Sequence, residues 1–235
     1  MTIPITYALA FENGTNEEFR LAFDDETMLL AATDDAVAAE WARLGFHQCP
    51  NCPLLPRDTP YCPAALHLED LVRRLGKVVS YEKVAVRVVT NEREIHQNTT
   101  AQTVFSSLMG LLIASSGCPH AAYFRPMARF HLPLASYEET IFRAASTYLM
   151  AQYFRHHLGE PFDVALKGLV TIYDDIQTVN ASLAQRLRNS GEITETNAIA
   201  HLDLYAQALP VAIEEALGEF RDLFGAYTSP TVGQT

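Results

Sequence analysis

The chain has 235 residues, of which 49% are hydrophobic and 19% are charged, and its formal net charge at pH 7 is -11. This composition excludes a disordered chain and predicts a folded protein with a substantial core, in one large domain or two small ones. The negative charge argues against a nucleic-acid or anionic-membrane partner, because phosphate groups bind to basic surfaces.

The N-terminal segment does not resemble a targeting sequence. Its first residues, MTIPITYALAFENG, contain no basic stretch and no long apolar run, so they do not predict a secretory signal peptide. The longest apolar run, near residues 108–114, is too short to cross a bilayer as a helix. We therefore expect a cytoplasmic protein with no membrane partner.

The first hundred residues predict an α+β module with a small antiparallel sheet. Alternating apolar residues predict strands over residues 3–12, 19–23, 28–31, 83–90 and 93–99. Asn13-Gly14 is a strong hairpin signal between the first two strands. A short helix is expected over residues 67–75, where Gly76 ends the leucine pattern.

After residue 100 the apolar spacing becomes helical. Helices are predicted over residues 101–115, 120–129, 136–158, 164–188 and 196–227. Ser136 and Glu139 have the spacing of a capping box, and Pro210 should kink the last helix. The sequence thus predicts an α+β fold in which residues 1–100 form a β module with a cysteine loop at 47–63. Residues 101–228 form a helical bundle, and the tail at 229–235 should be mobile.

All four cysteines of the chain are followed directly by proline: Cys49, Cys52, Cys62 and Cys118. Their spacing is C-x2-C-x9-C-x55-C. A C-x2-C turn can direct two thiolates at one point, and two more thiolates complete a four-sulfur site that suits zinc or an iron–sulfur cluster. Proline after each cysteine stiffens the backbone and holds the thiolates in place before metal binds.

The spacing favours an iron–sulfur cluster over zinc. Structural zinc sites usually use two local ligand pairs, whereas this chain has one pair, one single cysteine and a remote fourth ligand. Zinc stays the alternative. Disulfides are less favoured because cytoplasmic thiols are reduced, and four unrelated buried thiols are a further interpretation.

Three basic residues near Cys118 are candidates for contacts around such a centre. His120, Arg125 and Arg129 could offset the negative charge of a four-thiolate cluster and tune its potential. The alternative is that both arginines form a solvated helix face and His120 lies at the surface. A lone acidic pair, Asp174-Asp175, is more typical of a solvated helix face than of a metal–diphosphate motif.

The motifs CPNCP, YCP, SGCPH and FRPMARFHLP occur in this order ahead of YLMAQYFRHH. In these motifs the chain resembles an uncharacterised family of bacterial proteins over most of its length. The resemblance implies neither an activity nor catalytic residues.

Three functional hypotheses follow. The first is a cytoplasmic iron–sulfur protein that acts as a redox or gas-responsive regulator or as an electron carrier. The second is a non-catalytic interaction protein with structural zinc and an unknown protein partner. The third is an enzyme with a small-molecule pocket in the helical bundle. The chain lacks H-E-x-x-H, G-x-S-x-G, P-loop and G-x-G-x-x-G motifs, so no catalytic residue is predicted.

Overall fold

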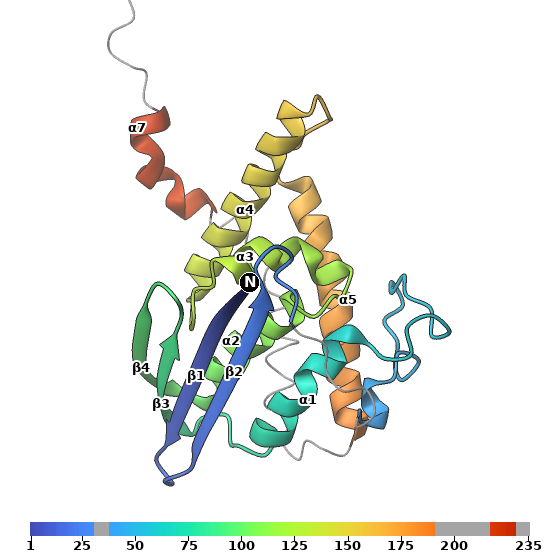
Figure 1. Cartoon of the computed structure of the whole chain (residues 1–235). Helices are drawn as coiled ribbons and strands as arrows, with labels where there is room; N and C mark the ends of the chain where they lie inside the picture. Colours follow the sequence, from blue (N-terminus) through green and yellow to red (C-terminus); the bar gives the residue numbers. More distant parts are fainter. Residues whose placement is uncertain (31–37, 191–216, 229–235) are drawn as a thin grey trace, which may run out of the picture.

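A computed structural model describes residues 1–30, 38–190 and 217–228 of the chain. It shows a four-stranded antiparallel sheet followed by several helices, which confirms the predicted α+β class (Figure 1). The strands are β1 (Thr2–Phe11), β2 (Asn16–Asp24), β3 (Lys83–Val89) and β4 (Glu94–Thr100). Their order in the sheet is β2-β1-β3-β4.

The sheet is built from two hairpins, as the alternating pattern predicts. Gly14, in the first turn, has a φ of 86°, which glycine adopts without a steric penalty. β1 pairs with β2 and also with β3, in both cases antiparallel. Alternate residues of β1 and β3 are buried, so one face of the sheet supplies half of the core. The segment between β2 and β3 holds three of the four cysteines.

Two expectations about this first half need correction. Instead of a strand over 28–31, Leu30 forms an isolated antiparallel bridge to Phe23, and the residues from 31 to 37 lie outside the described part. The helix expected over 67–75 begins four residues earlier, at Pro63, and ends at Leu75. The leucine pattern used for the prediction does not cover the first turn of this helix. Proline is nevertheless well suited to the first helical position.

The other helices follow the predicted order. Their bounds are η2 (Glu40–Ala42), α1 (Pro63–Leu75), α2 (Ala101–Ala114), η3 (His120–Phe124), α3 (Arg125–Arg129), α4 (Tyr137–His157), α5 (Lys167–Ser190), η4 (Arg221–Phe224) and α7 (Gly225–Thr228). The predicted capping box opens α4, since Glu139 N donates to Ser136 Oγ and Ser136 N donates to Glu139 Oε2. Most of the helix predicted over 196–227 and the tail at 229–235 lie outside the described residues.

The helix predicted from residue 164 starts three residues later, at Lys167. Leu166 has a φ of 60°, a left-handed conformation that precedes the helix rather than belonging to it. Asp163 lies outside the helix and accepts hydrogen bonds from the backbone N–H groups of Ala165 and Gly168. These bonds satisfy donors at the start of α5.

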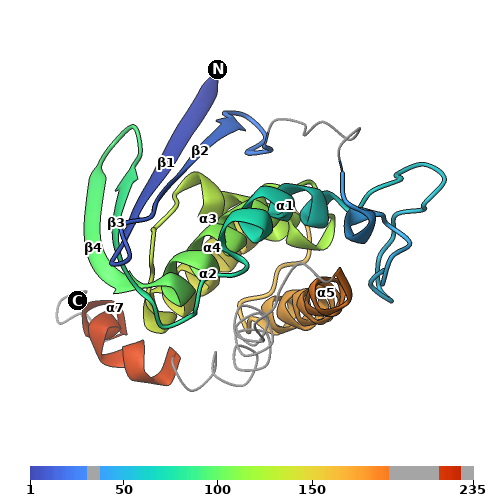
Figure 2. The same cartoon turned by 90° about the horizontal axis from the view of Figure 1, so that it is seen from below.

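Helix α2 packs against the sheet, and α5 lies on the side of α2 that is away from the strands (Figure 2). α1 and α2 pack against each other. Tyr7 connects the sheet to the helices, because its hydroxyl bonds to Ser107 of α2 and to His131. The buried core is continuous from the sheet to α5. No helix within the described ranges is long and apolar enough to span a membrane.

Candidate metal centre

The C-x2-C pair lies on a tight turn. The backbone N–H of Cys52 donates to the carbonyl of Cys49 at 3.0 Å. Gln48 closes the loop beyond it, because its Nε2 donates to the carbonyl of Leu54 at 2.9 Å. Cys49 is buried and Cys52 is partly exposed. The turn therefore carries one buried thiol and one thiol that is partly accessible from outside.

Cys62 directly precedes α1 and is held by a backbone bond. Its N–H donates to the carbonyl of Ala42 at 2.7 Å, beside the isolated bridge between Arg43 and Tyr61. Its side chain lies at the N-terminal end of a 13-residue helix. Unpaired N–H groups give this end of a helix a positive potential, which favours a thiolate or an anionic cluster.

Cys118 follows a turn that only glycine adopts easily. Gly117 has a φ of 90°, and Ser116 Oγ accepts a hydrogen bond from the N–H of Cys118 at 3.2 Å. The backbone N–H groups of His120 and Ala121 donate to the Cys118 sulfur and favour its thiolate, but burial raises the pKa of this thiol overall. N–H donors aimed at a sulfur are a means of stabilising iron–sulfur clusters.

The loop that carries Cys118 lies against both of the other cysteine segments. A Cβ added at Gly117 would lie 3.9 Å from Cβ of Pro63, next to Cys62. His120 Nε2 donates at 2.8 Å to the carbonyl of Asn51, which lies between Cys49 and Cys52. Three segments that are distant in sequence therefore meet at one place.

The thiols at this place interact electrostatically. Burial raises the pKa of Cys49 to about 11, and the charges of Cys62, Cys52 and Cys118 each raise it further, against a hydrogen bond with Ser182 that lowers it. All four cysteines are free thiols. Among the described residues, no three His, Cys, Asp or Glu side chains are arranged so that they could hold a metal ion. The charges of the other three thiols thus affect the pKa of Cys49, but the described residues form no ready-made metal-binding group.

Helix α5 contacts the segments that carry these cysteines. Ser182 bonds to the Cys49 thiol. Asp175 accepts a hydrogen bond from Asn51 Nδ2 at 3.0 Å, and its carboxylate lies 3.6 Å from Nδ1 of His120. Asn51 and His120 therefore link the cysteine turn and the Cys118 loop to each other and to α5.

One buried arginine attaches the same helix to the segment before the cysteines. Arg186 is fully buried, and its guanidinium donates to the carbonyls of Trp41 at 2.9 Å, Arg43 at 2.6 Å and Leu44 at 2.8 Å. These carbonyls belong to η2 and the turn after it. The bonds fix the start of the cysteine loop on α5.

Comparison with known proteins identifies a family. The family described as a domain of unknown function, DUF6901, matches residues 5–225. The chain belongs to the DUF6901 family. This agrees with the expectation of an uncharacterised family covering most of the chain. No curated protein and no solved structure matches the chain.

In this DUF6901 chain the three predicted basic residues have different surroundings. His120 contacts the cysteine turn, as described above. Arg125 is half-buried, and its Nε is buried with no hydrogen-bond partner among the described residues. Arg129 is exposed, and its guanidinium lies 5.4 Å from the ring centroid of Phe130. Within the described ranges, no hydrogen bond or ion pair joins Arg129 to the cysteine segments.

Sequence reasoning missed the contribution of α5 to the DUF6901 site. Ser182 lies one turn after Val179, and Arg186 one turn after Ser182, so they share a buried face. The available signal for Arg186 was a single basic residue between the apolar residues Leu183 and Leu187.

Proposed function

We propose that the four cysteines bind one iron–sulfur cluster, which joins the cysteine loop to the helical half of the protein. One observation carries the proposal: the loop that holds Cys118 contacts both of the other cysteine segments. Gly117 lies next to Pro63, and His120 bonds to Asn51. On binding, the four thiols lose their protons and become ligands. In the DUF6901 chain, Cys49, Cys52, Cys62 and Cys118 are the ligands.

The surroundings of the thiols suit an anionic cluster. The N-terminal end of α1 lies at Cys62, and two N–H groups face the Cys118 sulfur. His120 lies between the cysteine turn and Asp175, where its ring bonds to Asn51. We propose that His120 and, from the start of α3, Arg125 add positive charge near the cluster, with Arg129 contributing from the surface. Such neighbours raise the reduction potential of a cluster.

The spacing of the cysteines along the chain favours a cluster over a single zinc ion. Structural zinc sites usually use two local ligand pairs, whereas this chain has one pair, one single cysteine and a remote fourth. Structural zinc is the second candidate, and in that case the DUF6901 protein is a non-catalytic interaction protein.

The partial exposure of Cys52 supports a role in electron transfer or in sensing oxidants and gases. A cluster with one accessible ligand can exchange electrons with a partner protein or react with a small molecule. Loss of the cluster would release the Cys118 loop from the cysteine turn and weaken their contact with α5. We propose that this change is the regulatory signal, and that the protein works in the bacterial cytoplasm with a protein partner rather than with nucleic acid.

Purification without oxygen tests the proposal. We expect a brown protein that absorbs near 400 nm and contains iron and acid-labile sulfide in equal amounts, about four of each per chain for a cubane cluster. Exposure to air should bleach the absorption. A colourless protein with one zinc per chain would establish the second candidate, and a protein with neither metal, even after reconstitution with iron and sulfide, would refute both.

A further inference from the structure

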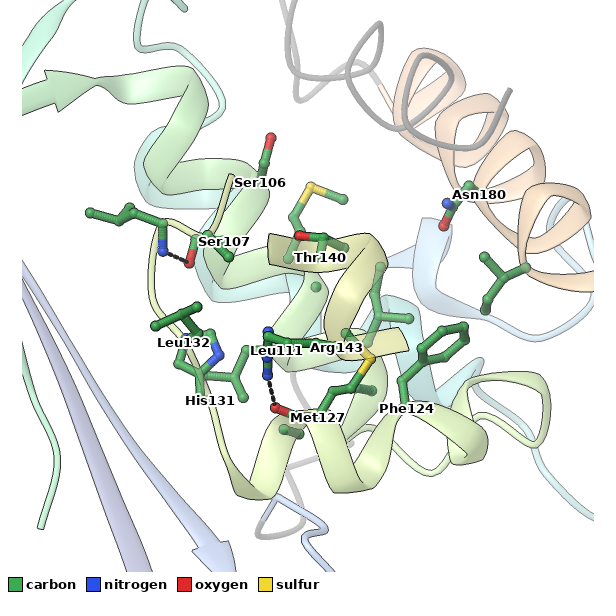
Figure 3. Close-up of a pocket in the computed structure, with 18 of the residues that line it drawn as sticks. Ser106, Ser107, Leu111, Phe124, Met127, His131, Leu132, Thr140, Arg143 and Asn180 are labelled. Atoms are coloured by element: carbon green, nitrogen blue, oxygen red, sulfur yellow. Dashed lines mark hydrogen bonds between the residues drawn. The ribbon is translucent and has the colours of Figure 1, made fainter. Parts of the chain in front are cut away.

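The helices form a partly open cavity that is separate from the cysteines. Its volume is about 260 Å³ as bounded by the described residues, and none of the cysteines lines it. It lies between α2, α3, α4 and α5 (Figure 3). Its walls are mostly apolar and include Met109, Leu111, Ile113, Phe124, Met127 and Tyr173. Methionine and aromatic walls adapt to apolar ligands of different shape.

One cationic side chain lines this apolar cavity. Arg143 of α4 lies between His131 and Met127 (Figure 3), and its Nη2 donates to the carbonyls of Met127 at 2.6 Å and Phe130 at 3.0 Å. No carboxylate lies within ion-pair distance of its guanidinium among the described residues. Glu139, one turn earlier, raises the pKa of Arg143 from a distance, but its carboxylate bonds to the start of α4.

The positive charge of Arg143 is only partly compensated by its surroundings. Desolvation lowers the pKa of its guanidinium, since a charged group loses favourable hydration in an apolar site. The neighbouring His131 adds no negative charge, because its Nε2 bonds to the neutral hydroxyl of Tyr7. Arg143 is half-buried, so its charge loses part of its hydration without gaining a counter-ion, and a bound anion would offset that loss.

A second polar group on the cavity wall also lacks a partner. Ser106 Oγ is buried and makes no hydrogen bond within the described part of the chain. Buried hydroxyl groups are nearly always hydrogen-bonded in folded proteins. Figure 3 shows Ser106 on a different part of the wall from Arg143, so its hydroxyl is a separate polar site of the cavity rather than a second donor to the same carboxylate.

We propose that the cavity binds a small monocarboxylic acid in its ionised form, with the carboxylate on Arg143 and an apolar body against the methionine and aromatic walls. The volume limits the size of the ligand. A water molecule occupies ~30 Å³ in the liquid, so 260 Å³ holds roughly nine non-hydrogen atoms. Octanoate has this size and this chemistry, and 1-octanol has nearly the same apolar body without the charge.

Calorimetric titration of the whole chain with octanoate and with 1-octanol tests the proposal. We expect saturable binding of octanoate that is roughly tenfold or more tighter than that of 1-octanol, because a charge-assisted bond to arginine is lost with the alcohol. Arg143→Gln should remove this preference, and Arg143→Lys should keep part of it. Equal binding of the two compounds, an unchanged preference in Arg143→Gln, or no saturable binding of octanoate would overturn the proposal.

A second pair of variants avoids any damage to the bonds that Arg143 makes with the end of α3. Gly110 lines the cavity, and a Cβ added there meets no atom within 4 Å. Gly110→Phe should place a ring in the cavity and abolish octanoate binding, while Gly110→Ala should bind octanoate as the unmodified protein does. Undiminished binding in Gly110→Phe would show that the ligand binds elsewhere and would refute the assignment of the cavity.

Discussion

Burial changes the chemistry of single side chains on both sides of α2. On the cysteine side it raises the pKa of Cys49 to about 11. On the other side it lowers the pKa of His131 to about 3, with a smaller contribution from the positive charge of Arg143. Both effects favour the neutral form of the group. Each of these residues therefore depends on a specific partner rather than on solvent, namely Ser182 for Cys49 and Tyr7 for His131.

The neutral state of His131 predicts a stability that falls on acidification. Below pH 6.5 the unfolded chain takes up a proton at this histidine, while the folded chain does so only near pH 3. The free energy of unfolding should therefore decrease as the pH falls from 6.5 to 3, by up to ~1.4 kcal/mol per pH unit from this group. In His131→Gln the decrease should be shallower.

Urea unfolding at several pH values measures this slope. His67, whose pKa is also lowered by burial, contributes in the same direction in both proteins, so the difference between them isolates His131. Identical slopes for the variant and the unmodified protein would show that His131 is not held neutral in the folded state.

Two glycines should respond oppositely to substitution by alanine. Gly110 lies inside α2 with open space at its Cβ position, so Gly110→Ala should stabilise the protein by about 0.5–1 kcal/mol. Gly117 has a φ of 90° and a nearest side-chain atom at 3.9 Å, so Gly117→Ala should destabilise it by about 1–2 kcal/mol through backbone strain alone. Thermal melts of both variants check this, and a stabilised Gly117→Ala protein would contradict the turn described before Cys118.

At the scale of elements, the parts of the fold with local signals could be predicted. The hairpins have alternating residues and turn glycines, and α4 has its capping box, so β1–β4 and α4 lie within a few residues of their expected bounds. The start of helix α1 was predicted too far along the chain, because its first turn is marked only by proline. In the candidate site, the Cys-Pro segments could be identified from the spacing of the cysteines in the sequence.

The contacts of α5 could not be predicted, because they are made with residues far away in sequence. Arg186 bonds to carbonyls more than 140 residues earlier, and Asp175 bonds to Asn51 across 124 residues. Nothing in the local sequence of α5 shows which loop will cover it. The cavity beside Arg143 likewise depends on how four helices meet, which their separate apolar patterns do not specify.

Removal of the Arg186 side chain should release the loop from α5. In Arg186→Met the carbonyls of Trp41, Arg43 and Leu44 lose their donors, and we expect a loss of about 2–4 kcal/mol in the free energy of unfolding. Gln185→Met, at an exposed position of the same helix, should change it by less than ~0.5 kcal/mol. Denaturant unfolding of both variants measures the difference, and equal effects would mean that the three bonds contribute nothing to stability.

At the scale of the whole molecule, the cysteine segments lie where parts of the chain that are distant in sequence come together. The turn at Cys49, the start of α1 and the loop at Cys118 meet beside α5, and the bonds of His120 and Arg186 also hold them there. A metal centre at this point would add its binding energy to the stability of the fold, because the unfolded chain has no such site.

Cys118→Ser gives the most direct test of this account. Serine is a poor ligand for a soft metal centre, so the variant should lose the iron and sulfide that the unmodified protein contains, and it should unfold at a lower temperature. Ala144→Ser is the control, since it adds a hydroxyl group at a buried position of α4 away from the cysteines and should cost only about 1–3 kcal/mol with its metal retained.

The decisive measurement is the metal content per chain of Cys118→Ser, determined beside the unmodified protein after purification without oxygen. The account predicts about four iron atoms per chain in the unmodified protein and in Ala144→Ser, as a cubane cluster requires, and little or none in Cys118→Ser. Full metal occupancy in Cys118→Ser would contradict the claim that Cys118 is a ligand that joins the two parts of the chain.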